Sequence, residues 1–215
     1  MKLARAEFER RWKANNLRVS LIGMSNIGKS WLAARLAAAL GIAVVEVDGF
    51  IRARLDKGSM ADFAKWLGHP NTSGYAEREA RSLALEDAAT LDALDTLEAP
   101  AILDTTGSVI YCPKACARLP RETFTVYLRA SAAQRKTLEA LYFSHSKPLN
   151  WAGHFEAREG ELFGDAVARC YPALLDSRDQ DYLALADHVV DAETIYATED
   201  AKALFALLKP APESS

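Results

Sequence analysis

The fold of this chain is decided by the stretch Gly23-Met24-Ser25-Asn26-Ile27-Gly28-Lys29-Ser30. It matches the pattern G-x-x-x-x-G-K-[ST] at every fixed position, and this pattern is typical of a loop that binds nucleotide phosphates. Residues 17–22 before the loop have the apolar, β-branched character of a buried strand. Residues 31–40 after it favour a helix that ends at Gly41. A strand, a glycine loop and a helix in this order predict the binding of a nucleoside triphosphate.

The chemistry of the loop predicts a role for each of its residues. Its glycines let successive backbone N–H groups point at phosphate oxygens, and the start of the following helix adds a partial positive charge. We expect Lys29 to neutralise the β- and γ-phosphates of ATP and the Ser30 hydroxyl to bind Mg²⁺. The predicted nucleotide-binding residues are Gly23, Met24, Ser25, Asn26, Ile27, Gly28, Lys29, Ser30 and Trp31.

The composition is that of an ordinary α/β domain. The chain has 215 residues, of which 50% are hydrophobic and 26% are charged, and this length suits a single domain over residues 1–215. A net charge of −3 does not favour nucleic acid or an anionic membrane as a partner. The first residues lack the apolar core of a signal peptide, and the three cysteines form no metal-binding pattern. We therefore expect a cytoplasmic protein, with the choice between monomer and dimer left open.

Strand and helix patterns alternate along the chain. The predicted strands cover residues 17–22, 43–48, 100–104, 124–128 and 188–191. The predicted helices cover residues 3–14, 31–40, 49–67 in pieces, 75–97, 131–143, 165–186 and 198–208. Residues 144–164 lose all periodicity and are predicted to form a lid, and residues 209–215 are predicted to be a disordered tail. This alternation favours a parallel sheet with helices on both faces, a three-layer α/β fold.

Acidic residues follow two of the predicted strands, where sites form in open α/β sheets. Asp104 ends an apolar strand, as a Walker-B aspartate does, and is predicted to hold Mg²⁺ together with Ser30. Asp48 closes the second strand and is predicted to orient and deprotonate the hydroxyl of a phosphate acceptor. The local alternatives are a turn or helix-capping aspartate at Asp104 and a helix cap at Asp48.

Several motifs together resemble shikimate kinases. Besides the phosphate loop, these are the strand end Glu46-Val47-Asp48, the lid segment Lys147-Pro148-Leu149, and Arg178 followed by Tyr182 and Ala186-Asp187 at the spacing of that family. The resemblance implies a nucleoside-monophosphate-kinase-like fold with five strands in the order 2-3-1-4-5 and a mobile lid. It also implies that Asp48 binds the acceptor hydroxyl, Arg178 pairs with an anionic group of the acceptor, and Lys147 contacts the transferring phosphate.

The acceptor half of the sequence departs from the family. Shikimate kinases carry Phe-Arg-x-x-Glu after the second strand, whereas Tyr75-Ala76-Glu77-Arg78-Glu79 places Ala76 at the arginine position, with Arg78 or Arg81 as possible substitutes. The family's triple glycine is replaced by Thr105-Thr106-Gly107. The predicted acceptor-binding residues are Asp48, Arg78, Gly107 and Arg178, and the predicted catalytic residues are Lys29, Asp48, Lys147 and Arg178.

These features predict an ATP-dependent phosphotransferase that acts on a hydroxyl of a small, anionic metabolite through an altered acceptor site. One alternative is a nucleotide-binding protein without catalysis. Another is a GTPase-type switch, suggested by the D-x-x-G element Asp104-Thr105-Thr106-Gly107. No Asn-Lys-x-Asp motif for reading guanine occurs in the chain, which disfavours the switch.

Overall fold

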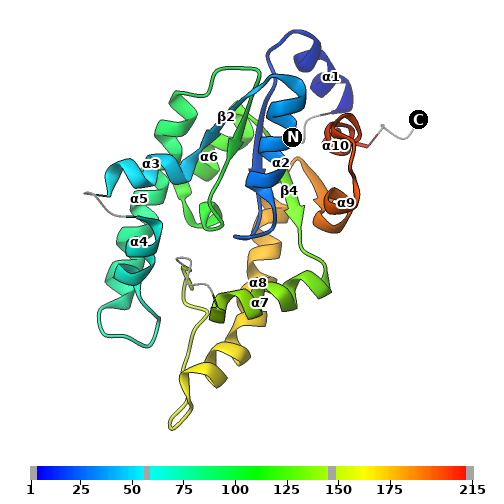
Figure 1. Cartoon of the computed structure of the whole chain (residues 1–215). Helices are drawn as coiled ribbons and strands as arrows, with labels where there is room; N and C mark the ends of the chain where they lie inside the picture. The colour runs from blue at the N-terminus through cyan, green and yellow to red at the C-terminus, as the bar shows by residue number, and fades with distance from the viewer. Residues whose placement is uncertain (1–3, 56–58, 145–148, 212–215) are drawn as a thin grey trace.

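A parallel five-stranded sheet forms the centre of the molecule. The computed structural model describes residues 4–55, 59–144 and 149–211 (Figure 1). The strands are β1 (Arg18–Ile22), β2 (Ala43–Glu46), β3 (Ala101–Asp104), β4 (Phe124–Arg129) and β5 (His188–Asp191). They lie in the order β2-β3-β1-β4-β5, which confirms the predicted topology.

The three inner strands are buried on both sides because helices cover both faces of the sheet. Every residue of β3 is buried, as are residues 19–22 of β1 and 124–128 of β4. In register, Leu21 of β1 lies beside Asp104 of β3 and Val126 of β4. The carboxyl ends of these strands therefore meet at one edge, where the phosphate loop begins.

The second strand differs from the sequence prediction. Residues 43–48 were expected to form a buried strand, but β2 ends at Glu46 and lies at the edge of the sheet, where Ala43 and Glu46 are exposed. Helix α3 (Val47–Arg54) begins directly after it. Asp48 consequently lies in the first turn of a helix rather than at the end of a strand.

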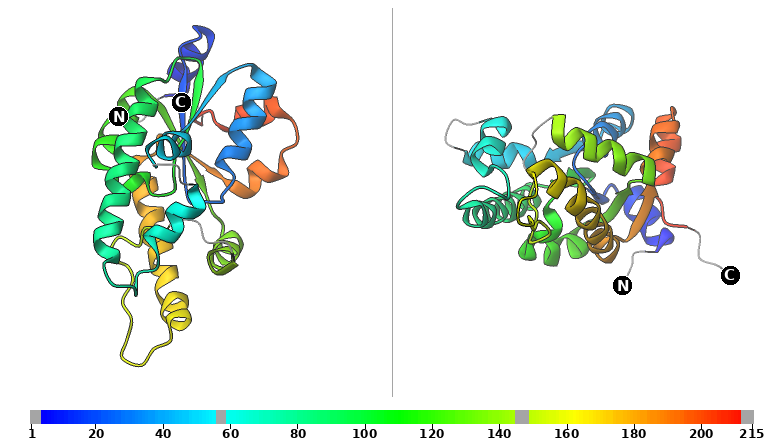
Figure 2. Two further views of the ribbon diagram at one scale, coloured as in Figure 1. Left: turned by 60° about the vertical axis from the view of Figure 1, so that its left-hand side comes forward. Right: turned by 90° about the horizontal axis from the view of Figure 1, so that it is seen from below.

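Helices cover the two faces of the sheet. Figure 2 shows α2 (Lys29–Leu40) and α10 (Ala201–Leu207) on one side, and α5 (Tyr75–Asp95), α6 (Pro113–Glu122) and α8 (Phe163–Leu185) on the other. The N-terminal helix α1 (Arg5–Lys13) closes one end of the core, since Phe8 packs edge-on against Phe124 with ring centroids 4.9 Å apart. No helix in the described part of the chain is long and apolar enough to cross a membrane.

The remaining helices match the predictions in part. The region 49–67 is helical in pieces, as α3 and α4 (Met60–Leu67). Helix α7 (Ala132–Ser144) begins after Ser131, whose hydroxyl accepts a hydrogen bond of 3.2 Å from Gln134 N, as expected of a cap. Helix α8 contains Pro172 in its interior, the predicted helix at 198–208 corresponds to α10, and α9 (Ala192–Ala197) was not predicted. Helix α6 and the 3-10 turn η1 (Val109–Tyr111) before it were not predicted from the sequence.

The predicted lid lies between α7 and α8. Within residues 149–162 the described backbone has no regular helix or strand, in agreement with the loss of periodicity. Lys147, predicted to contact the transferring phosphate, is outside the described residues, as are residues 212–215 of the predicted tail.

Candidate phosphate-transfer site

The phosphate loop connects β1 to α2 and is shaped by glycines at two demanding positions. Gly23 has φ of 140°, and a side-chain carbon there would come within 2.8 Å of Leu128 O. Gly28 is left-handed with φ of 99°, and the Tyr196 hydroxyl fills the space that a side chain would need. Both positions disfavour any other residue, because L-amino acids rarely adopt these angles and backbone or ring atoms lie too close.

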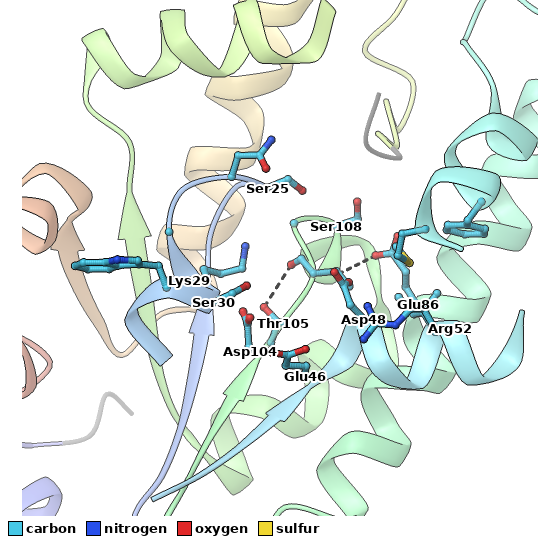
Figure 3. Close-up of a pocket in the computed structure, with 18 residues that line it drawn as sticks. Ser25, Lys29, Ser30, Glu46, Asp48, Arg52, Glu86, Asp104, Thr105 and Ser108 are labelled. Atoms are coloured by element: carbon cyan, nitrogen blue, oxygen red, sulfur yellow. Dashed lines mark hydrogen bonds between the residues drawn. The ribbon is translucent and has the colours of Figure 1, made fainter. Parts of the chain in front are cut away.

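The Lys29 side chain folds back over the phosphate loop. Its Nζ donates to Gly23 O at 2.9 Å and to Met24 O at 3.0 Å, although the side chain belongs to the first turn of α2. The ammonium group is therefore held at the centre of the loop, where a nucleotide's β- and γ-phosphates would bind. Figure 3 shows Lys29 beside Ser30 and Asp104.

Ser30 and Asp104 form an oxygen-rich site next to Lys29. Asp104 is 7% exposed, and its Oδ1 has no hydrogen-bond partner within the described residues. Burial raises the pKa of Asp104, whereas the Lys29 charge and a hydrogen bond with Ser30 counteract this rise. A hydroxyl, a carboxylate and nucleotide phosphates are the ligands that Mg²⁺ takes in phosphotransferases, so the two residues fit this ion.

A pocket of about 330 Å³ extends from the phosphate loop to α3, α4 and α5 (Figure 3). The phosphate half is lined by the loop, Ser30 and Asp104. The other half, which we call the acceptor half, is lined by Asp48, Arg52, Met60, Phe63, Glu86, Thr106 and Ser108. One cavity thus joins a phosphate site to a second chamber of mixed polarity.

Asp48 and Arg52 enter this chamber from α3. They are exposed and lie four residues apart, so they project from the same face of the helix. The structure shows no hydrogen bond or ion pair between the Arg52 guanidinium and another described residue. Both charges therefore face the open pocket.

Glu86 is a pocket residue that the sequence analysis missed. It lies on α5, is 4% exposed, and accepts hydrogen bonds from Thr106 Oγ1 at 2.8 Å and Asn150 Nδ2 at 3.0 Å. Burial raises the pKa of Glu86 to about 7, although the two donors and the Arg178 charge favour its ionised form. Perturbed carboxyl groups in clefts are characteristic of functional sites.

The structure does not bring Arg178 into the pocket. The residue is 2% exposed, and its guanidinium donates to Gly107 O at 3.0 Å and to Asn150 O at 2.6 Å. Tyr182 also donates to Gly107 O. Arg178 therefore fastens the loop after β3 and the residues beside the lid to α8, which differs from the predicted contact with an anionic acceptor.

Arg78 also lies outside the pocket lining. Its guanidinium donates to Leu67 O at 2.9 Å, Ser73 O at 2.8 Å and Thr72 Oγ1 at 2.8 Å, so it stabilises the turn before α5. Glu79, aligned with the family's glutamate, accepts from Ala152 N at 3.0 Å at the start of the lid. Among the described acidic residues of α5, Glu86 is the one that lines the pocket.

Trp31 of α2, directly after Ser30, also belongs to the site. It lines the pocket and is 37% exposed, with its ring centroid 5.4 Å from that of Tyr196. The Arg35 guanidinium lies 5.0 Å from the Trp31 ring centroid. An exposed aromatic pair next to the phosphate loop offers a surface on which a nucleotide base can stack.

Three solved shikimate kinases share this fold. The one from Acinetobacter baumannii, in complex with shikimate, has a TM-score of 0.63 and 18% identity, over 92% of this chain and 96% of that one. The one from Bacteroides thetaiotaomicron has a TM-score of 0.57 and 16% identity, with coverages of 89% and 94%. The one from Aquifex aeolicus has a TM-score of 0.54 and 19% identity, with coverages of 90% and 92%.

These similarities show that the chain has the same fold as these shikimate kinases. No protein-family model matches the sequence, and no curated protein matches it. At sequence identities of 16–19%, these similarities extend to the fold and not to the activity.

Proposed function

We propose that this protein transfers the γ-phosphoryl group of ATP to a hydroxyl group of a small metabolite. The observation that carries this proposal is the continuity of one pocket from Lys29 and Ser30 at the phosphate loop to Asp48 on α3. Phosphoryl transfer requires a phosphate cradle and a positioned acceptor oxygen in line with it, and the two halves of the pocket supply these two parts.

Each residue would have a distinct part in the transfer. The loop N–H groups and Lys29 hold the β- and γ-phosphates, while Asp48 orients the acceptor hydroxyl and takes its proton. The new bond forms between the acceptor oxygen and the γ-phosphorus, and the bond from that phosphorus to the β-phosphate oxygen breaks, which yields ADP and a phosphate monoester. Mg²⁺, held by Ser30 and Asp104, would supply positive charge for the phosphate oxygens.

The test is acceptor-dependent release of ADP from ATP–Mg²⁺ with the full-length protein. We expect release that depends on the acceptor, is lost in Lys29→Ala, and falls by about 10²-fold or more in Asp48→Asn with nucleotide binding retained. Release that is unchanged in both variants would contradict the proposal.

A nucleotide-binding protein without turnover is the second candidate, because the Arg78 and Arg178 guanidiniums donate hydrogen bonds to the backbone oxygens of Leu67 and Gly107. It predicts ATP binding that is lost in Lys29→Ala, with no acceptor-dependent release of ADP. A strong preference for GTP over ATP in a competition assay would instead favour the switch suggested by Asp104-Thr105-Thr106-Gly107.

A further inference from the structure

We propose that Glu86 determines acceptor specificity and that the acceptor is an uncharged compound with at least two neighbouring hydroxyl groups, such as a sugar or cyclic polyol. This inference rests on the proposed function, because it names the acceptor class for the same site. It differs from the anionic acceptor predicted from the sequence, because Arg78 and Arg178 are not among the residues that line this pocket.

The acceptor half of the pocket has more acidic than basic side chains. Asp48 on α3 and Glu86 on α5 contribute two carboxyl groups from separate helices, and Glu86 is ionised above its raised pKa of about 7. Arg52 is the only cation that lines this half among the described residues. A carboxylic acid in this chamber would place a third negative group beside two others, and like charges at close range disfavour binding.

Glu86 is fixed by two hydrogen bonds, and its carboxylate oxygens can accept further ones. Thr106 donates to its Oε2 and Asn150 to its Oε1, one hydrogen bond each. A carboxylate offers about four lone-pair sites, so both oxygens retain room for another donor. A hydroxyl of the acceptor can supply that donor, whereas an anionic group cannot.

The residues around Asp48 and Glu86 suit a ligand with several hydroxyl groups and an apolar face. When the reacting hydroxyl donates to Asp48, a neighbouring hydroxyl of the same molecule can donate to Glu86 across the chamber. Phe63 and Met60 of α4 form an apolar wall of the same pocket. Such a wall suits the C–H face of a sugar or cyclitol, while the hydroxyl edge meets the acids.

Arg52 does not alter this assignment. It is exposed and lies one helical turn after Asp48, whereas Glu86 is 4% exposed in the interior. A cation surrounded by water attracts an anion less strongly than a buried one, because water screens its charge. The buried carboxylate therefore dominates the choice of acceptor.

The experiment compares acceptors of the same carbon skeleton with and without a carboxylate, using the full-length protein with ATP–Mg²⁺ at pH 8, above the raised pKa of Glu86. The pairs are glucose with glucuronate, glycerol with glycerate, and shikimate with its analogue in which a hydroxymethyl group replaces the carboxylate. ADP release measures turnover, and calorimetry with a non-hydrolysable ATP analogue measures binding. We expect the neutral members to be bound and turned over in preference to the acids.

The variant Glu86→Gln keeps the side-chain shape and removes the charge. We expect it to raise the KM of the neutral acceptor about tenfold or more, because a hydrogen bond to a charged group is lost, with a change in the KM of ATP below about twofold. Glu77→Gln is the matched control, since Glu77 is an exposed residue of the same helix. Retained ATP binding by Glu86→Gln shows that the variant is folded.

Turnover of the acids alone, or a loss of acceptor affinity in Arg52→Gln without one in Glu86→Gln, would overturn this inference and leave the proposed function standing. Binding and turnover of neither set would count against both. Equal KM values for Glu86→Gln and the natural protein would overturn the role of Glu86 even if the neutral acceptors react.

Discussion

Arg178 donates a hydrogen bond of 3.0 Å to the carbonyl oxygen of Gly107, from a position that is 2% exposed. This bond holds the loop after β3, whose residue Gly107 lines the pocket, to helix α8. The arginine that the sequence resemblance assigned to the acceptor thus stabilises the wall of the site.

The first prediction follows from that contact. Replacing Arg178 by alanine would remove the side-chain donor to the buried Asn150 carbonyl and leave Gly107 O with Tyr182 as its donor. We expect the free energy of unfolding to fall by about 3 kcal/mol, measured by denaturant titration. Arg81→Ala, on the exposed face of α5, is the control. A variant as stable as the natural protein, with only its acceptor KM raised, would restore Arg178 to the acceptor site.

A second prediction concerns the contact between Gly107 and the phosphate loop. A side-chain carbon at Gly107 would lie 2.6 Å from Ser25 Oγ and 2.8 Å from Ser25 N. Because the backbone of the loop cannot give way without moving its N–H groups, we expect Gly107→Ala to weaken ATP binding about tenfold or more, measured by calorimetry. Gly164→Ala, where a side chain would meet nothing within 4 Å, should bind ATP normally.

The third prediction is the pH dependence that Glu86 gives to stability. Its pKa rises from 4.5 to about 7 on burial, with Asp48, Arg178 and the Cys112 thiol as neighbouring titratable groups. Between these values the unfolded chain has lost the proton and the folded chain still holds it. Protonated Glu86 therefore stabilises the folded state fully below about pH 4.5. This contribution, roughly 3 kcal/mol, is lost as the pH rises from about 4.5 through 7.

This pH effect is measured as the difference between the natural protein and Glu86→Gln in urea unfolding at pH 5 and pH 8. The natural protein should lose more stability than the variant on going to pH 8. Parallel behaviour of the two proteins would contradict the raised pKa of Glu86.

A fourth prediction uses Trp31 as a reporter. If a nucleotide base stacks on Trp31 and Tyr196 while its phosphates occupy the loop, ATP should change the tryptophan fluorescence and inorganic tripolyphosphate should change it less. The change should disappear in Trp31→Phe and persist in Trp66→Phe, since Trp66 is also exposed but lies on α4. Persistence of the full signal in Trp31→Phe would place the base elsewhere.

Much of the fold was predictable because local signals agreed with one another. The phosphate-loop glycines, the apolar inner strands and the cap at Ser131 each specify structure over a few residues. The edge position of β2 was not predictable in this way, because its short apolar run Ala43-Val44-Val45 resembles a buried strand.

The acceptor half was less predictable because polar residues occupy a buried helix face. Apolar positions and buried positions do not coincide along α5. Ala84 and Ala88 are exposed, whereas Ser82, Glu86 and Thr90 are buried. Hydrophobicity alone therefore does not mark the buried face of α5, and it gives no sign of the buried carboxyl group in the pocket. The side-chain directions of Arg78 and Arg178 likewise depend on tertiary contacts that sequence spacing does not contain.

The most direct test of the account is the rate of ADP release from ATP–Mg²⁺ with matched neutral and acidic hydroxyl compounds, in the natural protein, Lys29→Ala and Asp48→Asn. The account predicts release that depends on a neutral polyol, disappears in Lys29→Ala and falls by about 10²-fold or more in Asp48→Asn. ATP binding with no acceptor-dependent release from any compound would contradict the claim that this pocket transfers a phosphoryl group.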